Sequence, residues 1–304
     1  MRDHRVQSEL SSGKSRDVRS TPCDRRTAPA VFHEPPLVVF TTLATAGAGI
    51  LASTLIRPLV GAPVGLRPID SGMGAILIGT GFVFSTAHLG RKTRALLAIR
   101  RFGRSPLSTE VALGALLFMA AAAESMAMKM RFSVPPLDWF VAAVAVAFLV
   151  ALGFVYRLPG QVGWGFGSIA SPLASGVLSG SVWHLAMRTA AGTEGGPSFA
   201  PLVLATGADL VILAARWQSV DAARGRGSPV YSKAFALRHP IFGARLAILD
   251  LLAPLLALID ARFVGLAAVL AGLVLDRFAF YALAVRETVE GEIEQVEAVI
   301  AGRG

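Results

Sequence analysis

The sequence predicts an all-α integral membrane protein, a bundle of eight transmembrane helices. Of its 304 residues, 54% are hydrophobic and 16% are charged, whereas soluble domains average about 25% charged residues. The mean hydropathy of the protein is +0.59, and apolar runs near the length of about 20 residues needed to cross the hydrocarbon recur along it. Strand-like alternation is scarce, and a helix satisfies its own backbone hydrogen bonds in lipid, so the spans are expected to be helical.

Eight apolar runs are the expected spans. They cover residues 37–57, 71–90, 108–128, 138–156, 167–187, 200–217, 241–260 and 263–285. The sixth and seventh are the least regular, because they contain Asp209 and Asp250. A basic tail (1–32) rich in Arg and Ser is expected to be disordered, a membrane domain covers 33–285, and an acidic amphipathic tail (286–304) is expected to lie on another subunit.

Cysteine usage limits the cofactors that the protein can hold. Cys23 is the single cysteine, so no intrachain disulfide forms and no cysteine cluster exists for an iron–sulfur centre or a structural zinc. Haem held between spans is disfavoured because His88 and His184 fall at opposite ends of their helices. We therefore expect neither metal, haem nor an iron–sulfur cluster in this protein, and place any such centre on a partner.

The distribution of positive charge predicts the orientation. We call side A the side that holds the amino terminus. The tail holds seven Lys and Arg residues, the loop after the second span holds six, and the segment from Arg216 to Arg245 holds another six. Side B loops hold Arg57, Arg67, Lys129, Arg131, Arg188 and Arg262. Cytoplasmic loops carry the Lys and Arg excess, which predicts a multi-pass protein of the bacterial inner membrane with both termini cytoplasmic. The net charge of +9 thus indicates topology and not nucleic-acid binding.

The junction between the second and third spans concentrates polar residues on side A. His88 ends the second span, six basic residues follow, and Glu110 opens the third span. Ser108 is the expected cap of the third helix, with Glu110 in its first turn. Each residue alone is also compatible with an interfacial or capping role, but together they indicate a site.

Other ionisable residues fall at similar or greater depth. His33 stands at the side A end of the first span, and Arg277 lies in the side A half of the eighth. Glu124, Asp209 and Asp250 lie deeper, where proton routes and interhelical hydrogen bonds are both open alternatives.

A histidine and a carboxylate at a bilayer interface suit quinone chemistry. A quinone headgroup needs hydrogen-bond partners at two carbonyl oxygens, and its redox cycle moves two protons with two electrons. Imidazole exchanges protons near neutral pH, and a carboxylate next to water can pass them on. The isoprenoid tail would stay in lipid between apolar helices.

Three stretches resemble a known family, the membrane-anchor subunits of dimethyl sulfoxide reductase-type molybdoenzymes. They are "HEPPLVVFTT" (33–42), "STAHLGRKTRALLAIRRFGRSPLSTEVALG" (85–114) and "DRFAFYAL" (276–283). The resemblance implies an eight-helix subunit without haem that is not itself catalytic. It would anchor an iron–sulfur subunit and a molybdopterin catalytic subunit in the bilayer, and exchange electrons with menaquinone or ubiquinone in anaerobic respiration.

The resemblance also implies site residues. The family's His-Leu-Gly and Ser-x-Glu motifs, which are associated with its quinol site, fall on His88 and Glu110, and Arg94 matches the spaced arginine of the loop. His33 and Arg277 belong to the two shorter motifs. The sequence departs from the family where "HEPP" replaces His-Glu-Trp-Pro and where Leu273 occupies the place of an occasional acid.

Several alternatives remain at this level. Cytoplasmic docking on side A fits a relative of the membrane-bound sulfite-oxidising complexes as well as it fits a reductase, and an anchor of the polysulfide or nitrite reductase type differs mainly in loop motifs. A proton-coupled secondary transporter that uses Glu124, Asp209 and Asp250 is less favoured, because residues 37–156 and 167–285 show no internal repeat.

Overall fold

The computed structural model describes eight stretches of the protein. They are residues 35–56, 67–87, 102–132, 135–155, 166–190, 199–224, 240–259 and 261–282. The tails predicted at 1–32 and 286–304 lie outside the described residues. The described stretches are helical, and no strand occurs within them.

Each expected span corresponds to a long helix. The elements are α1 (Pro35–Ala52) with the short 3-10 turn η2 (Ser53–Leu55), α2 (Pro68–Ala87), α4 (Pro106–Lys129), α5 (Pro135–Phe154), α6 (Phe166–Ala190), α7 (Ala200–Arg224), η4 (Leu246–Leu252), α9 (Ala253–Leu258) and α10 (Arg262–Ala282). The π-helical η4 and α9 are parts of one span, Pro240–Leu258. The protein is therefore a multi-pass helical membrane protein, as the length of its apolar runs predicted.

Among the described residues, seven of these helices are long and apolar enough to cross a membrane, and α6 is the one that falls short. This helix has 25 residues and is about 37 Å long at 1.5 Å per residue, so its length is sufficient. Its composition is less apolar because it carries many serines and glycines, and most of its described side chains are buried by other helices. A helix shielded from lipid has no need of an apolar surface all round.

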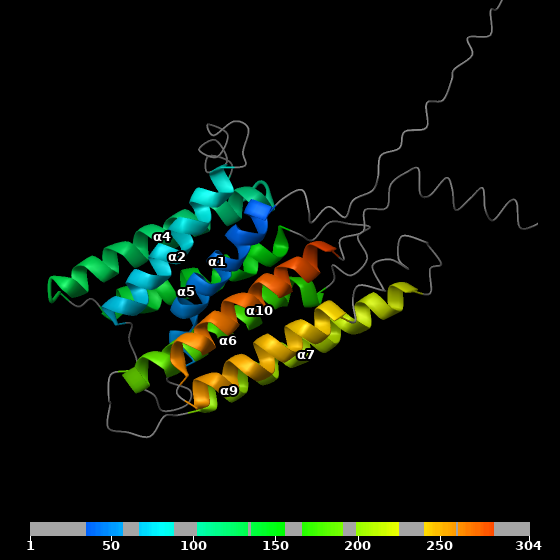
Figure 1. Cartoon of the computed structure of the whole chain (residues 1–304). Helices are drawn as coiled ribbons and strands as arrows, with labels where there is room; N and C mark the ends of the chain where they lie inside the picture. The colour runs from blue at the N-terminus through cyan, green and yellow to red at the C-terminus, as the bar shows by residue number, and fades with distance from the viewer. Residues whose placement is uncertain are drawn as a thin grey trace, which may run out of the picture.

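The helices form two groups that meet at α1 (Figure 1). On one side, α1 packs against α2 and α5, and α4 packs against both of these. On the other side, α1 packs against α6 and α10, and α7 and α9 complete that group. We call these the first and second groups. Successive helices alternate in direction, so the beginnings of α4 and α6 share the side A end of the bundle with the ends of α7 and α10.

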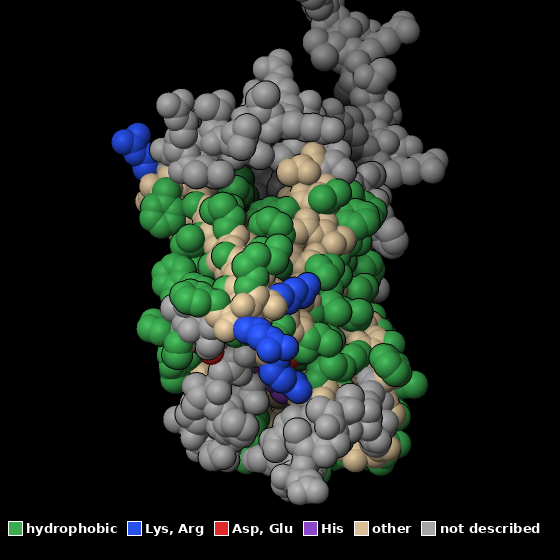
Figure 2. Space-filling view, turned by 90° about the vertical axis from the view of Figure 1, so that its left-hand side faces the viewer, with side chains coloured by type: hydrophobic (Ala, Val, Ile, Leu, Met, Phe, Trp, Pro, Cys, Tyr) green, Lys and Arg blue, Asp and Glu red, His purple; other side chains and the backbone are tan. Residues whose placement is uncertain are grey.

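The outer surface is apolar, as expected of a lipid-facing bundle. Figure 2 shows one face covered mainly by hydrophobic side chains, with Lys and Arg in a few small groups. Large apolar side chains point outward from both groups, among them Phe118 of α4, Val211 of α7 and Phe263 of α10. In water such exposure would be a liability, but hydrocarbon is the medium that these side chains match.

A close contact between backbones joins the two groups. Gly176 and Gly180 lie one turn apart on α6, in a small-xxx-small pattern that lets membrane helices approach closely. A Cβ on Gly49 of α1 would lie 2.0 Å from the carbonyl oxygen of Gly176, and one on Gly180 would lie 2.1 Å from the carbonyl oxygen of Gly49. These distances leave no room for a side chain, so glycine sets the spacing between α1 and α6.

Candidate functional site

The side A end of α4 is fixed by a reciprocal serine cap. The Ser105 hydroxyl accepts a hydrogen bond from the Ser108 backbone N–H at 3.2 Å, and the Ser108 hydroxyl accepts one from the Ser105 N–H at 3.3 Å. Pro106 occupies the first turn, where its missing N–H costs nothing. The prediction that Ser108 caps the helix is wrong: Ser105 is the cap and Ser108 its partner. Glu110 is consequently just past the first turn.

Glu110 faces the interior of the first group. Glu110 is 3% exposed. The same buried face of α4 continues with the spacing of an inward-facing helical stripe through Gly114, Leu117, Ala121 and Glu124. Glu110 and Glu124 are 14 residues apart, or about 21 Å along the axis. The stripe therefore carries one carboxyl group near each side of the membrane, with apolar packing between them.

A groove lies beside this helix end, between α4 and α5. Its volume is about 460 Å³. Arg104 and Thr109 line it together with the apolar Leu113, Val150 and Phe154. Thr109 precedes Glu110 on α4, but consecutive helical residues point about 100° apart, and Glu110 is not among the residues that line the groove. This helix end therefore carries a mainly apolar groove on one face and a buried carboxyl group on another.

The other predicted site residues have different outcomes. His33, His88 and Arg94 lie outside the described residues, so their placement stays a prediction. Arg277 is described: it is 2% exposed and donates to Asp276 at 3.2 Å and to Ser175 at 3.3 Å. Its helix packs against α1 and α6, whereas α4 packs against α2 and α5. The structure thus does not bring Arg277 together with Glu110.

Arg277 belongs to a buried group of six charges in the second group of helices. We call it the arginine–aspartate cluster; its members are Arg216, Arg245, Arg277, Asp209, Asp250 and Asp276, each at most 3% exposed. They come from α7, the Pro240–Leu258 span and α10, and Ser171 and Ser175 of α6 border them. Three positive and three negative side chains balance in formal charge, which is the arrangement that burial of charges requires.

Arg245 joins three helices. Its two terminal nitrogens donate to Asp209 of α7 and to Asp250 of η4, and Nε lies 3.3 Å from Oδ1 of Asp276 on α10. The planar guanidinium with its fixed fork of donors is suited to such simultaneous pairing, which a lysine would not reproduce.

Asp276 is the acid shared by all three arginines. Its Oδ1 accepts from Arg216 at 2.6 Å and from Arg245, and its Oδ2 lies 3.2 Å from Arg277. The Ser171 hydroxyl donates to Oδ2 at 3.2 Å. With both oxygens occupied by donors, this carboxylate is fully compensated within the protein.

Arg216 reaches the cluster between aromatic rings. Its guanidinium carbon lies 5.5 Å from the ring centroid of Phe242 and 6.0 Å from that of Phe280, within the range of cation–π attraction. A Cβ on Gly167 of α6 would lie 2.7 Å from Cγ of Arg216, so the glycine makes space for the arginine stem.

The π-helical turn places Arg245 and Asp250 on one face. The two residues are five positions apart, which is the hydrogen-bond spacing of a π-helix, and its wider turn brings the two side chains closer to one face than an α-helix would. Pro254 follows in α9, and a proline ring clashes with the carbonyl four residues earlier in a regular helix. The widened turn avoids this clash, and it aligns the ion pair.

Part of this cluster was predicted incorrectly from the sequence. Arg216 and Arg245 were counted among the six Lys and Arg residues of a side A segment, but both are buried inside helices. Of the other four, Arg224 ends α7 and three lie outside the described residues, so the orientation signal there is weaker than expected. Asp209 and Asp250 were weighed as proton routes or as interhelical hydrogen-bond partners. Asp209 does pair with Arg245 of another helix, whereas Asp250 pairs with Arg245 within its own span.

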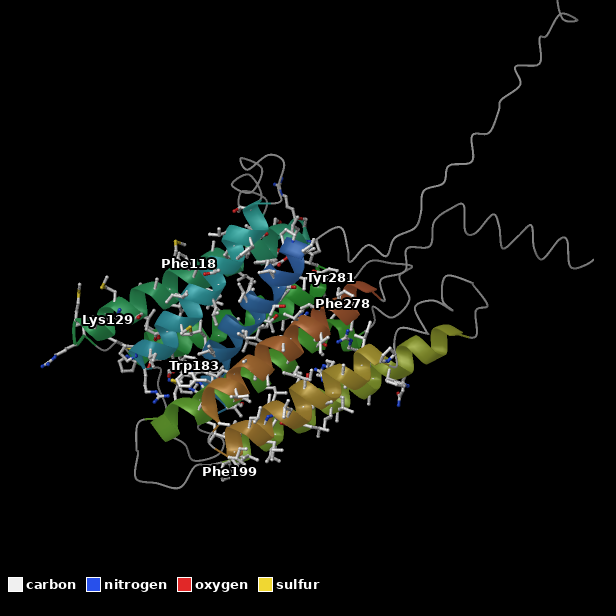
Figure 3. All side chains as sticks on the ribbon, viewed as in Figure 1. Phe118, Lys129, Trp183, Phe199, Phe278 and Tyr281 are labelled. Carbon is white, nitrogen blue, oxygen red and sulfur yellow. The ribbon has the colours of Figure 1, made fainter. Side chains whose placement is uncertain are left out.

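Side B carries its own polar contacts. Asp70, at the start of α2, accepts a hydrogen bond from Trp183 at 2.9 Å and lies 3.7 Å from Nδ1 of His184. The other ring nitrogen of His184 lies 3.1 Å from the carbonyl oxygen of Ile50. Figure 3 places Trp183 and Lys129 toward one end of the bundle and Phe278 and Tyr281 toward the other. His184 is therefore remote from the side A site, as its position in the sequence predicted.

Glu124 is held at the same side. It accepts a hydrogen bond from Ser71 at 2.8 Å, and the next residue of α4, Ser125, donates to the carbonyl oxygen of Pro68 at 3.0 Å. These bonds tie the side B end of α4 to the start of α2. Within the described stretches, no group of three or more His, Cys, Asp and Glu residues is placed to hold a metal ion.

Comparison with known proteins finds relatives of the first group of helices. Residues 30–158 match the family model described as DMSO reductase anchor subunit (DmsC). Over 91 residues the protein is 37% identical to the C subunit of anaerobic dimethyl sulfoxide reductase from Escherichia coli (strain K12). Over 90 residues it is 38% identical to YnfH, an anaerobic dimethyl sulfoxide reductase subunit of the same strain. Residues 30–158 are thus similar to the DMSO reductase anchor subunits.

The DmsC match covers the first group of helices and not the second. Each pairwise alignment covers 29% of this protein and 32% of the relative, so the match spans about a third of the length of the curated relatives. The DmsC match includes His33, His88, Arg94 and Glu110, whereas Arg277 lies beyond it with the whole arginine–aspartate cluster. No solved structure matches the protein.

Proposed function

We propose that this protein is the membrane anchor of a molybdopterin and iron–sulfur oxidoreductase complex, and that it binds quinone or quinol on side A. The observation that carries the proposal is Glu110: a carboxyl group 3% exposed, inside the family match, and next in sequence to Thr109, which lines a groove of about 460 Å³ at the same helix end. A buried ionisable group at such a depth marks a site or a pair.

The chemistry assigned to the site is proton-coupled electron transfer. Oxidation of one quinol releases two electrons and two protons; an iron–sulfur subunit docked on side A would accept the electrons one at a time, and the protons leave toward water on side A. Glu110 accepts a proton from the quinol hydroxyl as the quinone forms, and reduction of quinone reverses these steps. His88 is proposed as the hydrogen-bond partner of the second headgroup oxygen, with Arg94 and His33 at the same surface.

The groove supplies an apolar wall for the ring and the start of the isoprenoid tail. Leu113, Val150 and Phe154 line it, and ligand pockets are typically apolar with few polar groups that fix orientation. The partner subunits dock on side A, which we place in the cytoplasm of a bacterium with both termini on that side. A reporter fused after Gly304 that proves periplasmic would overturn this orientation.

Purification in mild detergent tests the anchor role. A tag on this protein is expected to recover an iron–sulfur subunit and a molybdenum-containing subunit in fixed ratio. The substrate that the purified complex reduces or oxidises then distinguishes three possibilities: a dimethyl sulfoxide reductase-like enzyme, a sulfite-oxidising enzyme, and an enzyme of the polysulfide or nitrite reductase type. Recovery of the tagged protein alone from native membranes would contradict the anchor role.

A matched pair of carboxyl variants on one helix tests the quinone site. Glu110→Gln is expected to lower quinol-coupled turnover by about 100-fold, the lower range of a lost general acid–base group, while turnover with artificial dyes stays intact. Glu124→Gln removes the other buried carboxyl of the same helix face and should leave quinol-coupled turnover unchanged. Equal rates in the two variants would show that Glu110 has no part in the quinone reaction.

A further inference from the structure

The side B end of α4 is closed by a backbone arrangement that usually contains glycine. The N–H of Phe132 donates to the carbonyl oxygen of Ala127 at 2.9 Å, and the N–H of Arg131 donates to that of Met128 at 3.0 Å. These are the two bonds of a Schellman motif, and the residue at the place of Arg131 takes a left-handed conformation that favours glycine. Arg131 has a φ of +59°, and no other non-glycine residue of the described stretches has a positive φ. A side chain is therefore kept here despite a backbone penalty.

The protein interior does not account for the arginine at this position. Arg131 and Lys129 are both exposed, and within the described part of the chain the salt bridges at this end involve Asp70 and not these two residues. The acids are turned inward, because Asp70 is 0% exposed and Glu124 is 1% exposed. The helix dipole favours a cation in the last turn, which accounts for Lys129, but its effect falls off within that turn.

A third cation lies near the same helix end. Ser125, one turn before Lys129 on α4, donates to the carbonyl oxygen of Pro68 at 3.0 Å, and Pro68 follows Arg67 in the chain. The Arg67 side chain is 32% exposed. Residues four apart share a helix face, so Lys129 is on the face of α4 that meets the start of α2. We call Arg67, Lys129 and Arg131 the basic patch.

Apolar side chains accompany the basic patch. Met130 and Phe132 are 71% and 66% exposed, and they alternate along the chain with two of its cations. Trp139 and Phe140, near the start of α5, are exposed as well, and tryptophan is enriched at membrane–water interfaces. Figure 2 faces the end of the bundle where Figure 3 labels Lys129, and it shows a group of Lys and Arg side chains among hydrophobic ones. Cations next to exposed apolar side chains match a ligand with an anionic head and a hydrocarbon chain.

We propose that the basic patch binds the headgroup of an acidic phospholipid in the side B leaflet, with the acyl chains along Met130 and Phe132. Each cation near an anionic membrane surface strengthens the attraction by a factor of about 5. The patch lies at the end of α4 opposite Glu110, so it is separate from the proposed quinone site. Arg131 is the member that carries a backbone penalty, and lipid binding is the gain that offsets it.

Replacing Arg131 by glycine separates the backbone penalty from the lipid contact. The assembled complex is measured in nanodiscs of phosphatidylcholine and in nanodiscs of phosphatidylglycerol. In phosphatidylcholine, Arg131→Gly is expected to keep or raise the midpoint of thermal unfolding, because glycine adopts the left-handed conformation without penalty. In phosphatidylglycerol, the same variant should unfold about 2–4 °C below the wild type, because a headgroup contact is lost. The other basic residues are the same in both proteins and cancel in this comparison.

Arg131→Lys is the matched control, because it keeps the charge and the left-handed side chain and should follow the wild type in both lipids. An effect of Arg131→Gly that is the same in the two lipids would overturn the proposal. Soluble glycerol 3-phosphate, added to the phosphatidylcholine discs, supplies the phosphate without acyl chains and should change neither protein. If it stabilised the wild type over Arg131→Gly as phosphatidylglycerol does, the patch would bind free phosphate and the assignment to a lipid would be wrong.

Discussion

Helices α2, α4 and α5 meet α1 through an apolar core, whereas α6, α7 and α10 surround six charged side chains. The first core contains large buried residues such as Leu51, Leu117 and Phe148. The second group also has apolar packing around Leu178, Leu249 and Leu273, but its interior additionally holds the arginine–aspartate cluster. One fold thus uses two means of holding helices together within the same membrane.

The difference reflects what drives helix association in lipid. Hydrocarbon is as apolar as leucine, so close packing and polar contacts between helices must supply the specificity that water supplies in soluble proteins. The first group relies on packing and keeps its two α4 carboxyl groups, Glu110 and Glu124, near the membrane surfaces. The second group places ion pairs between helices.

The largest expected effect comes from removing the cation that three acids share. Arg245→Leu leaves Asp209 and Asp250 without a charged partner, and Asp276 with one fewer. Breaking a buried ion pair by deleting one partner costs about 3–5 kcal/mol. Thermal unfolding in detergent should show this loss, whereas Lys129→Leu, at the exposed end of α4, should change the unfolding midpoint little. Comparable losses from both variants would mean that the cluster does not stabilise the second group.

The backbone contact between α1 and α6 is expected to be the next most sensitive to substitution. Gly49→Ala puts a methyl carbon 2.0 Å from the carbonyl oxygen of Gly176, so α1 and α6 must move apart, at a cost of about 1–3 kcal/mol. Gly207 of α7 has no atom within 4 Å of the added carbon, and Gly207→Ala is expected to be neutral or stabilising by up to about 1 kcal/mol. Comparing the two unfolding midpoints checks the contact, and a stable Gly49→Ala protein would contradict it.

The smallest effect is expected at the cap of α4. Ser105→Ala removes the hydroxyl that accepts from the Ser108 N–H and should cost about 1 kcal/mol. Hydrogen exchange of the first amides of α4 should accelerate, while amides beyond Leu117 stay protected. Thr86→Ala, at a half-buried position in the last turn of α2, is the control. Unchanged exchange in Ser105→Ala would indicate that the loop before α4 holds the helix end.

The sequence predicted the helices well because length and apolarity are local properties. Each expected span lies within a few residues of a helix, and even the span with Asp250 is continuous from Pro240 to Leu258. The cap was placed at Ser108 because both serines fit the capping pattern, and only the backbone geometry identifies Ser105 as the first non-helical residue. Boundaries within a run of capping residues are not determined by composition.

The charged cluster was not predictable because its contacts are distant in the sequence. Arg216 and Asp276 are 60 residues apart, and Arg245 and Asp209 are 36 apart. Both arginines stand near the ends of apolar runs, where a loop position is the ordinary expectation. A signal was nevertheless present: two acids at membrane depth, Asp209 and Asp250, require partners of opposite charge. Searching for those partners would have pointed to the neighbouring arginines.

The central claim is that the quinone site belongs to the first group of helices and the charge cluster to the second. The most direct test measures the ratio of quinol-coupled to dye-coupled turnover per assembled complex in Glu110→Gln and in Arg277→Gln. Arg277 is chosen because it is the one predicted quinone contact that the structure places in the arginine–aspartate cluster. We expect the ratio to fall by about 100-fold in Glu110→Gln and to match the wild type in Arg277→Gln. A ratio that falls in Arg277→Gln and stays at the wild-type value in Glu110→Gln would contradict the account.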